Sequence, residues 1–140
     1  MLFKEEYSRC PIDAKKVVSK EFGNEHILLN NSKIPVYQFH IDGDIERGTE
    51  ERCDYIVEAE KSTAPQAYII ELKGSDLNKA IGQIERTIQR YYQRLKGYRI
   101  LPRIVIHRTS THDIQGKKCR DLRRKYPLTV IKTRKYQETL

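Results

Sequence analysis

A strand-like run in the middle of the chain ends in acidic and basic residues that alternate. Glu71 comes directly after Ile69 and Ile70, and Leu72 separates it from Lys73. Because successive side chains of a strand point to opposite faces, Glu71 and Lys73 project from the same face at the end of this strand. A carboxylate beside an ammonium group can take part in cation binding and in stabilising negative charge. A solvent-exposed ion pair is the simpler interpretation of this tripeptide when it stands alone.

A second acidic residue, Asp54, lies in the preceding strand-like run. This run covers residues 53–59, and residues 61–65 connect it to the run at 67–73, a connection that suits a hairpin. Antiparallel pairing of the two runs places Asp54 opposite Glu71, because both residues lie far from the connection. The hairpin therefore brings two carboxylates and an ammonium group to one end of the paired strands.

Two carboxylates on neighbouring strands are suitable ligands for Mg²⁺, with Mn²⁺ as a substitute. We expect Asp54 and Glu71 to bind the metal, and the backbone carbonyl of Leu72 to add a ligand. A metal-bound water is a better nucleophile than free water. The ammonium group of Lys73 would orient that water or stabilise charge on phosphorus. This is chemistry suited to the hydrolysis of a phosphodiester.

The region that follows has the clearest helical pattern in the chain. In residues 76–96 apolar residues recur every three or four positions, with Ser75 as the expected N-cap and Gly97 as the expected stop. Gln83 lies beside the apolar stripe, on the same side of the helix as a row of cations. The cations that we expect to contact nucleic-acid phosphates are Lys79, Arg86, Arg90 and Arg94.

The other elements follow from shorter patterns. We expect helices at residues 12–22 and 113–126 and strands at 34–41, 102–107 and 128–133. The order is then α-β-β-β-α-β-α-β, with strands that first pair as hairpins and later connect through helices. This order predicts an α/β protein in which a mixed sheet is flanked by helices.

Asp54, the hairpin, Glu71-x-Lys73 and the following helix together resemble the PD-(D/E)XK nuclease superfamily, which has the restriction-endonuclease-like fold. The resemblance covers most of the chain, from the first expected helix to the last strand. It implies that Asp54 and Glu71 bind metal and that Lys73 is catalytic. It also matches Gln83 to a glutamine found in several branches, including Holliday-junction resolvases and RecB-like nucleases.

The chain departs from the superfamily pattern at one position and offers two candidates for another. Cys53 stands where the name-giving motif has proline, at a position that varies in the superfamily. Some branches carry a further acid on the first helix, and here either Asp13 or Glu21 would match it. The sequence does not choose between these two acids.

The distribution of charge agrees with a polyanionic partner. Residues 1–75 contain 10 Lys and Arg against 14 Asp and Glu, whereas residues 76–140 contain 17 against 5. A basic half in a protein with a formal net charge of +8 suggests nucleic acid. Residues 117–125 are especially basic, and a solvated surface is an equally good interpretation of that segment.

The composition indicates how many domains the chain forms and which classes of protein it does not belong to. A chain of 140 residues with 38% hydrophobic and 33% charged residues is typical of one globular domain. Its apolar runs are short, its beginning lacks a signal-peptide pattern, and its three cysteines lie far apart. We therefore expect a single-domain cytoplasmic protein without a membrane span, a disulfide framework or a zinc site.

These observations predict a Mg²⁺-dependent nuclease that hydrolyses phosphodiester bonds in DNA. The alternative is an inactive relative of the same fold that binds nucleic acid or a protein. Homodimerisation is expected only by analogy with small members of the superfamily. The sequence leaves open whether RNA is also cut, which form of DNA is preferred, and whether cleavage is sequence-specific.

Overall fold

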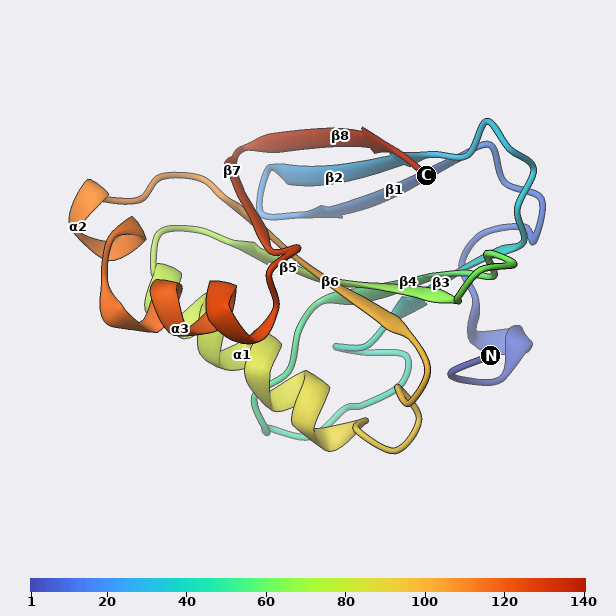
Figure 1. The fold of residues 1–140 in the computed structure, drawn as a ribbon, viewed down its shortest axis with the longest axis horizontal. Coiled ribbons are helices and arrows are strands. Elements are labelled where there is room, and N and C mark those ends of the chain that lie inside the picture. The colour runs from blue at the N-terminus through green and yellow to red at the C-terminus, as the bar shows by residue number, and fades with distance from the viewer.

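A mixed five-stranded sheet forms the centre of the molecule (Figure 1). The computed structural model describes all residues from 1 to 140 and orders these strands β3-β4-β5-β6-β7. The first three strands pair antiparallel, and β5, β6 and β7 pair parallel. Their bounds are β3 (Val36–His40), β4 (Tyr55–Ala59), β5 (Gln66–Lys73), β6 (Arg99–Ile106) and β7 (Val130–Thr133).

A second, three-stranded sheet covers one face of the central sheet (Figure 1). β1 (Lys16–Glu21) and β2 (Asn24–Leu29) form an antiparallel hairpin, and β8 (Lys135–Thr139) pairs parallel with β2. Val17 and Leu28 of this sheet pack against the central strands. One of the two hydrophobic cores therefore lies between the sheets.

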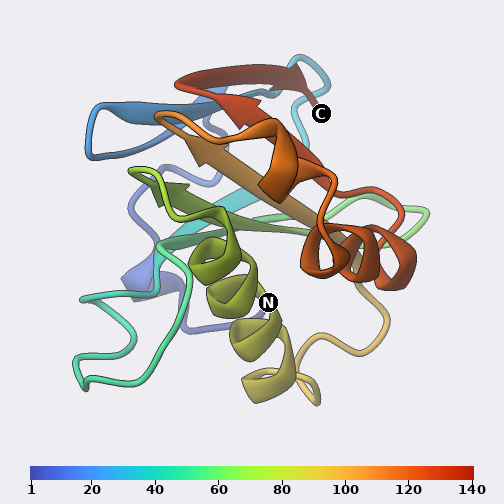
Figure 2. The ribbon, with the colours of Figure 1, turned by 90° about the vertical axis from the view of Figure 1, so that its left-hand side faces the viewer.

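Helices cover the opposite face, as Figure 2 shows from the side. They are α1 (Leu77–Arg90) and α3 (Lys117–Lys125), with the single turn α2 (Thr111–Ile114) before α3 and a 3₁₀ turn, η1 (Glu5–Tyr7), near the N-terminus. The second core lies between α1, α3 and the sheet. None of the helices has the length and apolar character needed to cross a membrane.

The helix expected at residues 76–96 is present but shorter. Asp76, not Ser75, is the N-cap, and its side chain accepts a hydrogen bond of 3.0 Å from the Lys79 N–H. The helix ends at Arg90, and the chain then passes through a series of turns to Gly97, whose φ is 84°. The apolar stripe of the sequence continues into these turns, since Leu95 is buried in the same core.

The helix expected at residues 12–22 is wrong. That segment contains β1, which begins a hairpin whose turn is Phe22 and Gly23. Ile12 and Phe22, which a helix would have buried, are 45% and 75% exposed. The β-branched side chains of the segment favour a strand once β2 is available as a partner. Gly23 is a turn residue and not a helix stop.

Other expectations are confirmed or refined. Strands occur where they were expected at residues 34–41, 53–59, 67–73, 102–107 and 128–133. The helix expected at residues 113–126 is divided into α2 and α3 by Gln115 and Gly116. β2 and β8 were not expected at all. The mixed α/β class is therefore confirmed, but the predicted order fails at its first element, and helices cover only one face of the central sheet.

Candidate active site

Two buried carboxylates face each other across β4 and β5. Tyr55 pairs with Ile70, so the next residues outward, Asp54 and Glu71, lie opposite each other. The Asp54 Oδ2 accepts a hydrogen bond of 2.7 Å from the N–H of Leu72, in place of a backbone acceptor. Asp54 is 8% exposed and Glu71 is 2% exposed. The juxtaposition expected from the hairpin is therefore present.

Burial and mutual repulsion make this pair difficult to ionise. Burial raises the pKa of Asp54 to about 6. Burial, together with the neighbouring charge of Asp54, raises the pKa of Glu71 to about 10, although the positive charge of Lys73 acts in the opposite direction. The raised pKa values favour a proton on the pair at neutral pH, because burial and mutual repulsion both oppose a second negative charge. Either this proton or a cation must neutralise the pair.

One oxygen of the pair has no partner. The Glu71 Oε1 is buried and makes no hydrogen bond. Buried polar atoms are nearly always hydrogen-bonded, so an orphaned carboxylate oxygen beside a second carboxylate fits an oxygen-seeking cation. The structure has no group of three or more His, Cys, Asp or Glu side chains suited to a metal. An ion here would therefore have two carboxylate ligands and take its remaining oxygens from backbone, water or substrate.

Lys73 ends β5 on the face that carries Glu71, as the strand alternation predicted. Its side chain is half-buried, and its backbone is held from two sides. The Lys73 carbonyl accepts hydrogen bonds from Asn24 Nδ2 at 2.9 Å and from the His107 N–H at 3.0 Å. Asn24 belongs to the β1–β2 hairpin, which sequence reasoning had not recognised. The strand end is thus fixed in place by a second strand and by the smaller sheet.

Leu72 contributes its backbone to the candidate site and its side chain to the core. Its side chain is fully buried in the core between the two sheets, while its N–H binds Asp54. That the Leu72 carbonyl binds a metal ion remains a prediction.

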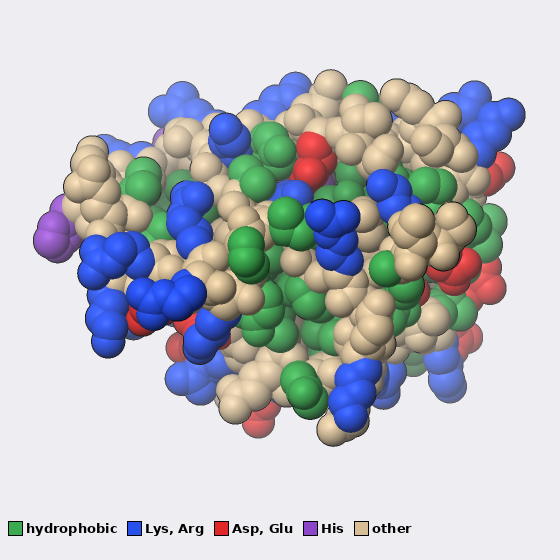
Figure 3. Space-filling view, viewed as in Figure 1, with side chains coloured by type: hydrophobic (Ala, Val, Ile, Leu, Met, Phe, Trp, Pro, Cys, Tyr) green, Lys and Arg blue, Asp and Glu red, His purple; other side chains and the backbone are tan.

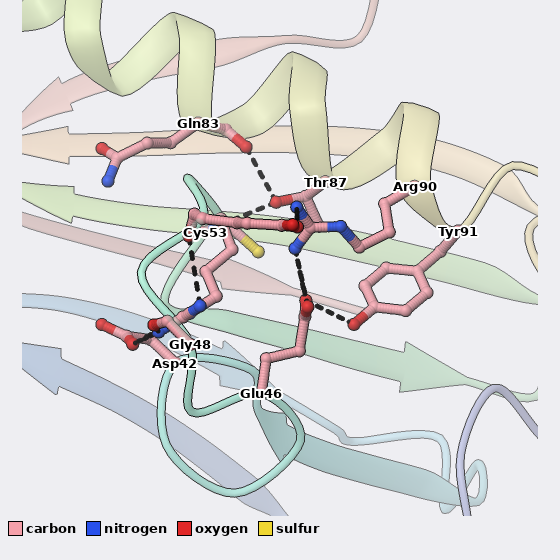
Figure 4. Close-up of polar contacts among 10 residues, drawn as sticks. Asp42, Glu46, Gly48, Cys53, Gln83, Thr87, Arg90 and Tyr91 are labelled. Atoms are coloured by element: carbon pink, nitrogen blue, oxygen red, sulfur yellow. Dashed lines mark hydrogen bonds and ion pairs between the residues drawn. The ribbon is translucent and has the colours of Figure 1, made fainter.

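Gln83 lies on α1, where a relay of hydrogen bonds connects the helix to the residue before Asp54 (Figure 4). The Thr87 hydroxyl donates to the Gln83 carbonyl at 2.8 Å and accepts from the Cys53 N–H at 2.7 Å. The Gln83 Oε1 is buried without a partner. Gln83 also lines a polar cavity of about 220 Å³ together with Lys79. Thr87, which the sequence analysis did not single out, is fully buried and connects α1 to the chain segment before Asp54.

Of the two acids that the sequence left open, Glu21 is the one near the pair. Its negative charge contributes to the raised pKa of Asp54, after the larger effect of burial. Glu21 ends β1 and lies 3.9 Å from His40 Nε2. Asp13 is exposed in the chain before β1. Neither acid lies on a helix, so the expected helical position is wrong.

The cations expected to bind phosphates fall into two groups. The Arg90 guanidinium is bound to both oxygens of Glu46, at 2.7 and 2.8 Å, and to Glu50 (Figure 4). Arg94 donates to the Leu2 carbonyl at 2.8 Å and lies over the ring of Phe3. Internal acceptors thus occupy these two arginines. The row expected along the helix is therefore not a continuous free surface.

Lys79, in the first turn of α1, and Arg86, in its C-terminal half, remain open to solvent. Arg86 is 65% exposed, and its one acidic contact is Glu51 at 2.9 Å. Together with Lys118 of α3 they line a cavity of about 370 Å³ that has no hydrophobic residue. The cavity with Gln83 also contains Lys79 and Glu51, so the two hollows are neighbours.

α3 continues this basic surface. Figure 3 shows Lys and Arg side chains gathered at the end of the molecule that carries α3. The helix ends in consecutive basic residues, and Arg123 is exposed. The exposed cations of this helix are Lys117, Lys118, Arg120, Arg123, Arg124 and Lys125.

Neither the protein-family models, nor the curated proteins, nor the solved structures contain a match to this chain. The functional argument therefore rests on the residues and their geometry. An acid pair that requires neutralisation, a lysine on the same strand face and a basic surface on α1 and α3 are together suited to a substrate with a phosphate.

Proposed function

We propose that this protein is a metal-dependent nuclease of the PD-(D/E)XK type that hydrolyses phosphodiester bonds in DNA. The observation that carries the proposal is the buried pair of Asp54 and Glu71, with its orphaned oxygen and with Lys73 on the same strand face. Burying two carboxylates side by side destabilises a fold unless a proton or a cation neutralises them. Mg²⁺ or Mn²⁺ is the ligand that suits their oxygens.

Each residue has a distinct role in this proposal. A bound Mg²⁺ would make a coordinated water more acidic and offset charge on the phosphoryl group. Asp54 and Glu71 hold the ion as carboxylates, for which Glu71 must release its proton. Lys73 stabilises the negative charge that develops on phosphorus, and the Gln83 amide orients the water or the substrate. The backbone carbonyl of Leu72 is the further ligand.

The arrangement of elements supports the finer description of the fold. β5 carries the acid and lysine, pairs antiparallel with β4 and parallel with β6, and leads into α1. These elements correspond to the hairpin, motif strand and following helix on which the resemblance was based. Lys79, Arg86 and Lys118 lie in the adjoining polar hollows and supply sequence-independent contacts to phosphates.

The proposal is tested by incubating the purified protein with supercoiled plasmid and Mg²⁺ or Mn²⁺. We expect nicked or linear product, no product with EDTA, and loss of cleavage in Asp54→Asn and Glu71→Gln. Calorimetry with Mn²⁺ should give a binding isotherm for the wild type and none for the double variant. Glu5→Gln, at an exposed acid outside the site, is the matched control. An identical isotherm in the double variant would exclude the metal site.

The same experiment decides between this function and the inactive binding module. Nucleic-acid binding without cleavage, in the presence of either metal, would favour the module. The basic surface of α3 favours the binding module as the second candidate function. Its cations could bind phosphates whether or not the acid pair is catalytic.

A further inference from the structure

The β1–β2 hairpin carries an aromatic side chain, Phe22, in its turn, between Glu21 and Asn24, and the Asn24 side chain contacts Lys73. Glu21 pairs with Asn24, which leaves Phe22 and Gly23 as a two-residue turn with φ angles of 53° and 77°. The hydrogen bond of 2.9 Å from Asn24 Nδ2 to the Lys73 carbonyl fastens this turn to the strand that carries Glu71 and Lys73. The turn therefore has a defined position relative to the acid pair.

Phe22 is an unfavourable residue for this turn. Two-residue turns with positive φ at both positions prefer Asn, Asp or Gly, and a bulky residue with positive φ is strained. The ring is 75% exposed, more than any other large hydrophobic side chain of the protein. It pairs with no other aromatic ring. Phe22 thus has both a strained backbone and an exposed ring, a combination that often marks a ligand-binding position.

The surroundings of Phe22 identify the kind of ligand. The turn lines a shallow hollow of about 510 Å³ in which Phe22 is the sole hydrophobic residue. A protein partner normally requires a broader apolar surface. Lys20, Glu21 and Glu25 also line the hollow, so its lining has no excess of positive charge that would hold a phosphate. A nucleobase, which is uncharged and offers a π-face, suits a single aromatic ring with polar neighbours.

We infer that Phe22 stacks on an unpaired base of the nucleic-acid strand whose phosphate lies at Asp54 and Glu71. The preferred substrate then has a single-stranded, frayed or branched position next to the cleaved bond. This inference rests on the proposed nuclease function and adds the form of the substrate to it. A base within a continuous duplex has both faces covered by its neighbours and must first be unstacked.

The test measures binding in EDTA at low salt, so that nothing is cut. Fluorescence anisotropy compares a single-stranded oligonucleotide with a blunt duplex of equal length. For Phe22→Ala and Phe22→Asn we expect an affinity for the single strand about tenfold lower, the scale of one lost base–aromatic contact, and little change for the duplex. Phe22→Trp should retain binding. Tyr92→Ala, at an aromatic residue that is 60% exposed beyond the end of α1, is the control.

Phe22→Asn also separates a binding role from a structural one. Asn suits the turn, so its midpoint of thermal unfolding should equal or exceed that of the wild type, whereas a structural role for Phe22 predicts a lower midpoint. Sedimentation of both proteins completes the comparison. Dissociation of a wild-type dimer by this substitution would overturn the inference and make Phe22 a contact between subunits.

Two further outcomes distinguish this inference from the proposed function. Unchanged single-strand affinity in both Phe22→Ala and Phe22→Asn, with plasmid cleavage intact in the wild type, would reject the stacking role alone. Absence of nucleic-acid binding and cleavage by the wild type, with every form tested, would reject the proposed function and this inference with it. Loss restricted to single strands, with Phe22→Trp active, supports the inference.

Discussion

At the acid pair, stability favours apolar side chains, whereas the proposed chemistry requires carboxylates. Apolar side chains at positions 54 and 71 would be buried at a lower cost in free energy. Burial disfavours the charge of both Asp54 and Glu71, and each charge repels the other. The Leu72 N–H compensates Asp54 in part, but the Glu71 Oε1 has no compensating donor. Either a proton or a divalent cation can neutralise the pair, and the proposed chemistry requires the cation.

Lys73 gives a prediction at this scale, because it lies on the strand face that carries Glu71 and the proposed mechanism gives it an electrostatic role and not a role as metal ligand. Lys73→Ala should still bind Mn²⁺ and DNA, while cleavage falls by about a hundredfold or more, as expected when one positioned electrostatic group is lost. Single-turnover cleavage and Mn²⁺ calorimetry measure the two properties separately. Lys61→Ala, at a half-buried lysine in the β4–β5 connection, is the control. Comparable cleavage rates in Lys73→Ala and wild type would rule out Glu71-x-Lys73 as the catalytic tripeptide.

Among the elements, the segment between β3 and β4 is organised by α1. Arg90 binds Glu46 and Glu50, and the Tyr91 hydroxyl donates to Glu46 at 2.6 Å (Figure 4). A charge-assisted bond to two oxygens at a partly buried position is among the stronger polar contacts in proteins. This segment leads directly into Asp54, so the contacts made by Arg90 help to set the position of the acid pair.

Arg86 and Arg90 are therefore expected to behave differently when they are changed. Arg90→Leu should lower the free energy of unfolding by about 1.5–3 kcal/mol, because charged hydrogen bonds are lost, and should leave the salt dependence of DNA binding unchanged. Arg86→Glu should have little effect on stability, and should flatten the log–log salt dependence by about 0.9 for each lost phosphate contact. Urea unfolding and anisotropy at several salt concentrations measure both effects. If Arg90→Leu flattened the salt dependence and Arg86→Glu lowered the stability instead, Arg90 would be assigned to nucleic-acid binding.

At the scale of the whole molecule, the two sheets are joined by a buried polar cluster. The Glu138 carboxylate of β8 accepts hydrogen bonds of 2.7 and 3.1 Å from Arg103 of β6, and lies 2.7 Å from His26 Nε2 of β2. Tyr68 and Tyr136 lie beside the His26 ring. The cluster thus connects three strands of two different sheets.

The cluster makes part of the stability depend on pH. Burial alone would raise the pKa of Glu138, but the hydrogen bonds from His26 and Arg103 outweigh burial and hold this pKa below its ordinary value. The stabilisation is therefore complete above the pKa of an unfolded glutamate, about 4.3, and is lost as the pH falls through the folded pKa. Glu138→Gln should reduce the free energy of unfolding by about 3 kcal/mol at pH 7.

Urea unfolding of wild type and Glu138→Gln between pH 7 and pH 3 measures this effect. The difference between the two proteins should persist down to about pH 4.3 and shrink below it. Taking the difference cancels the contributions of Asp54 and Glu71, which both proteins share. A difference that grew as the pH fell would contradict the assigned role of Glu138.

Features that depend on neighbouring residues could be predicted from the sequence. Alternation along residues 67–73 placed Glu71 and Lys73 on one face, and the short connection to residues 53–59 placed Asp54 opposite Glu71. The apolar stripe located α1, although its end was placed six residues too late. Strand alternation, hairpin pairing and helical periodicity act over a few residues, so they can be recognised without knowledge of the fold.

Features that depend on distant partners were decided only by the tertiary structure. Residues 12–22 contain a strand because β2 pairs with them, and Arg90 is occupied by Glu46, 44 positions away, and does not join the exposed cations of α1. Glu138 meets His26 across 112 positions. The position of the β1–β2 turn relative to β5 likewise depends on the contact between Asn24 and Lys73. Such partners are chosen by packing and charge compensation among segments that local periodicity cannot relate, so only the folded chain brings them together.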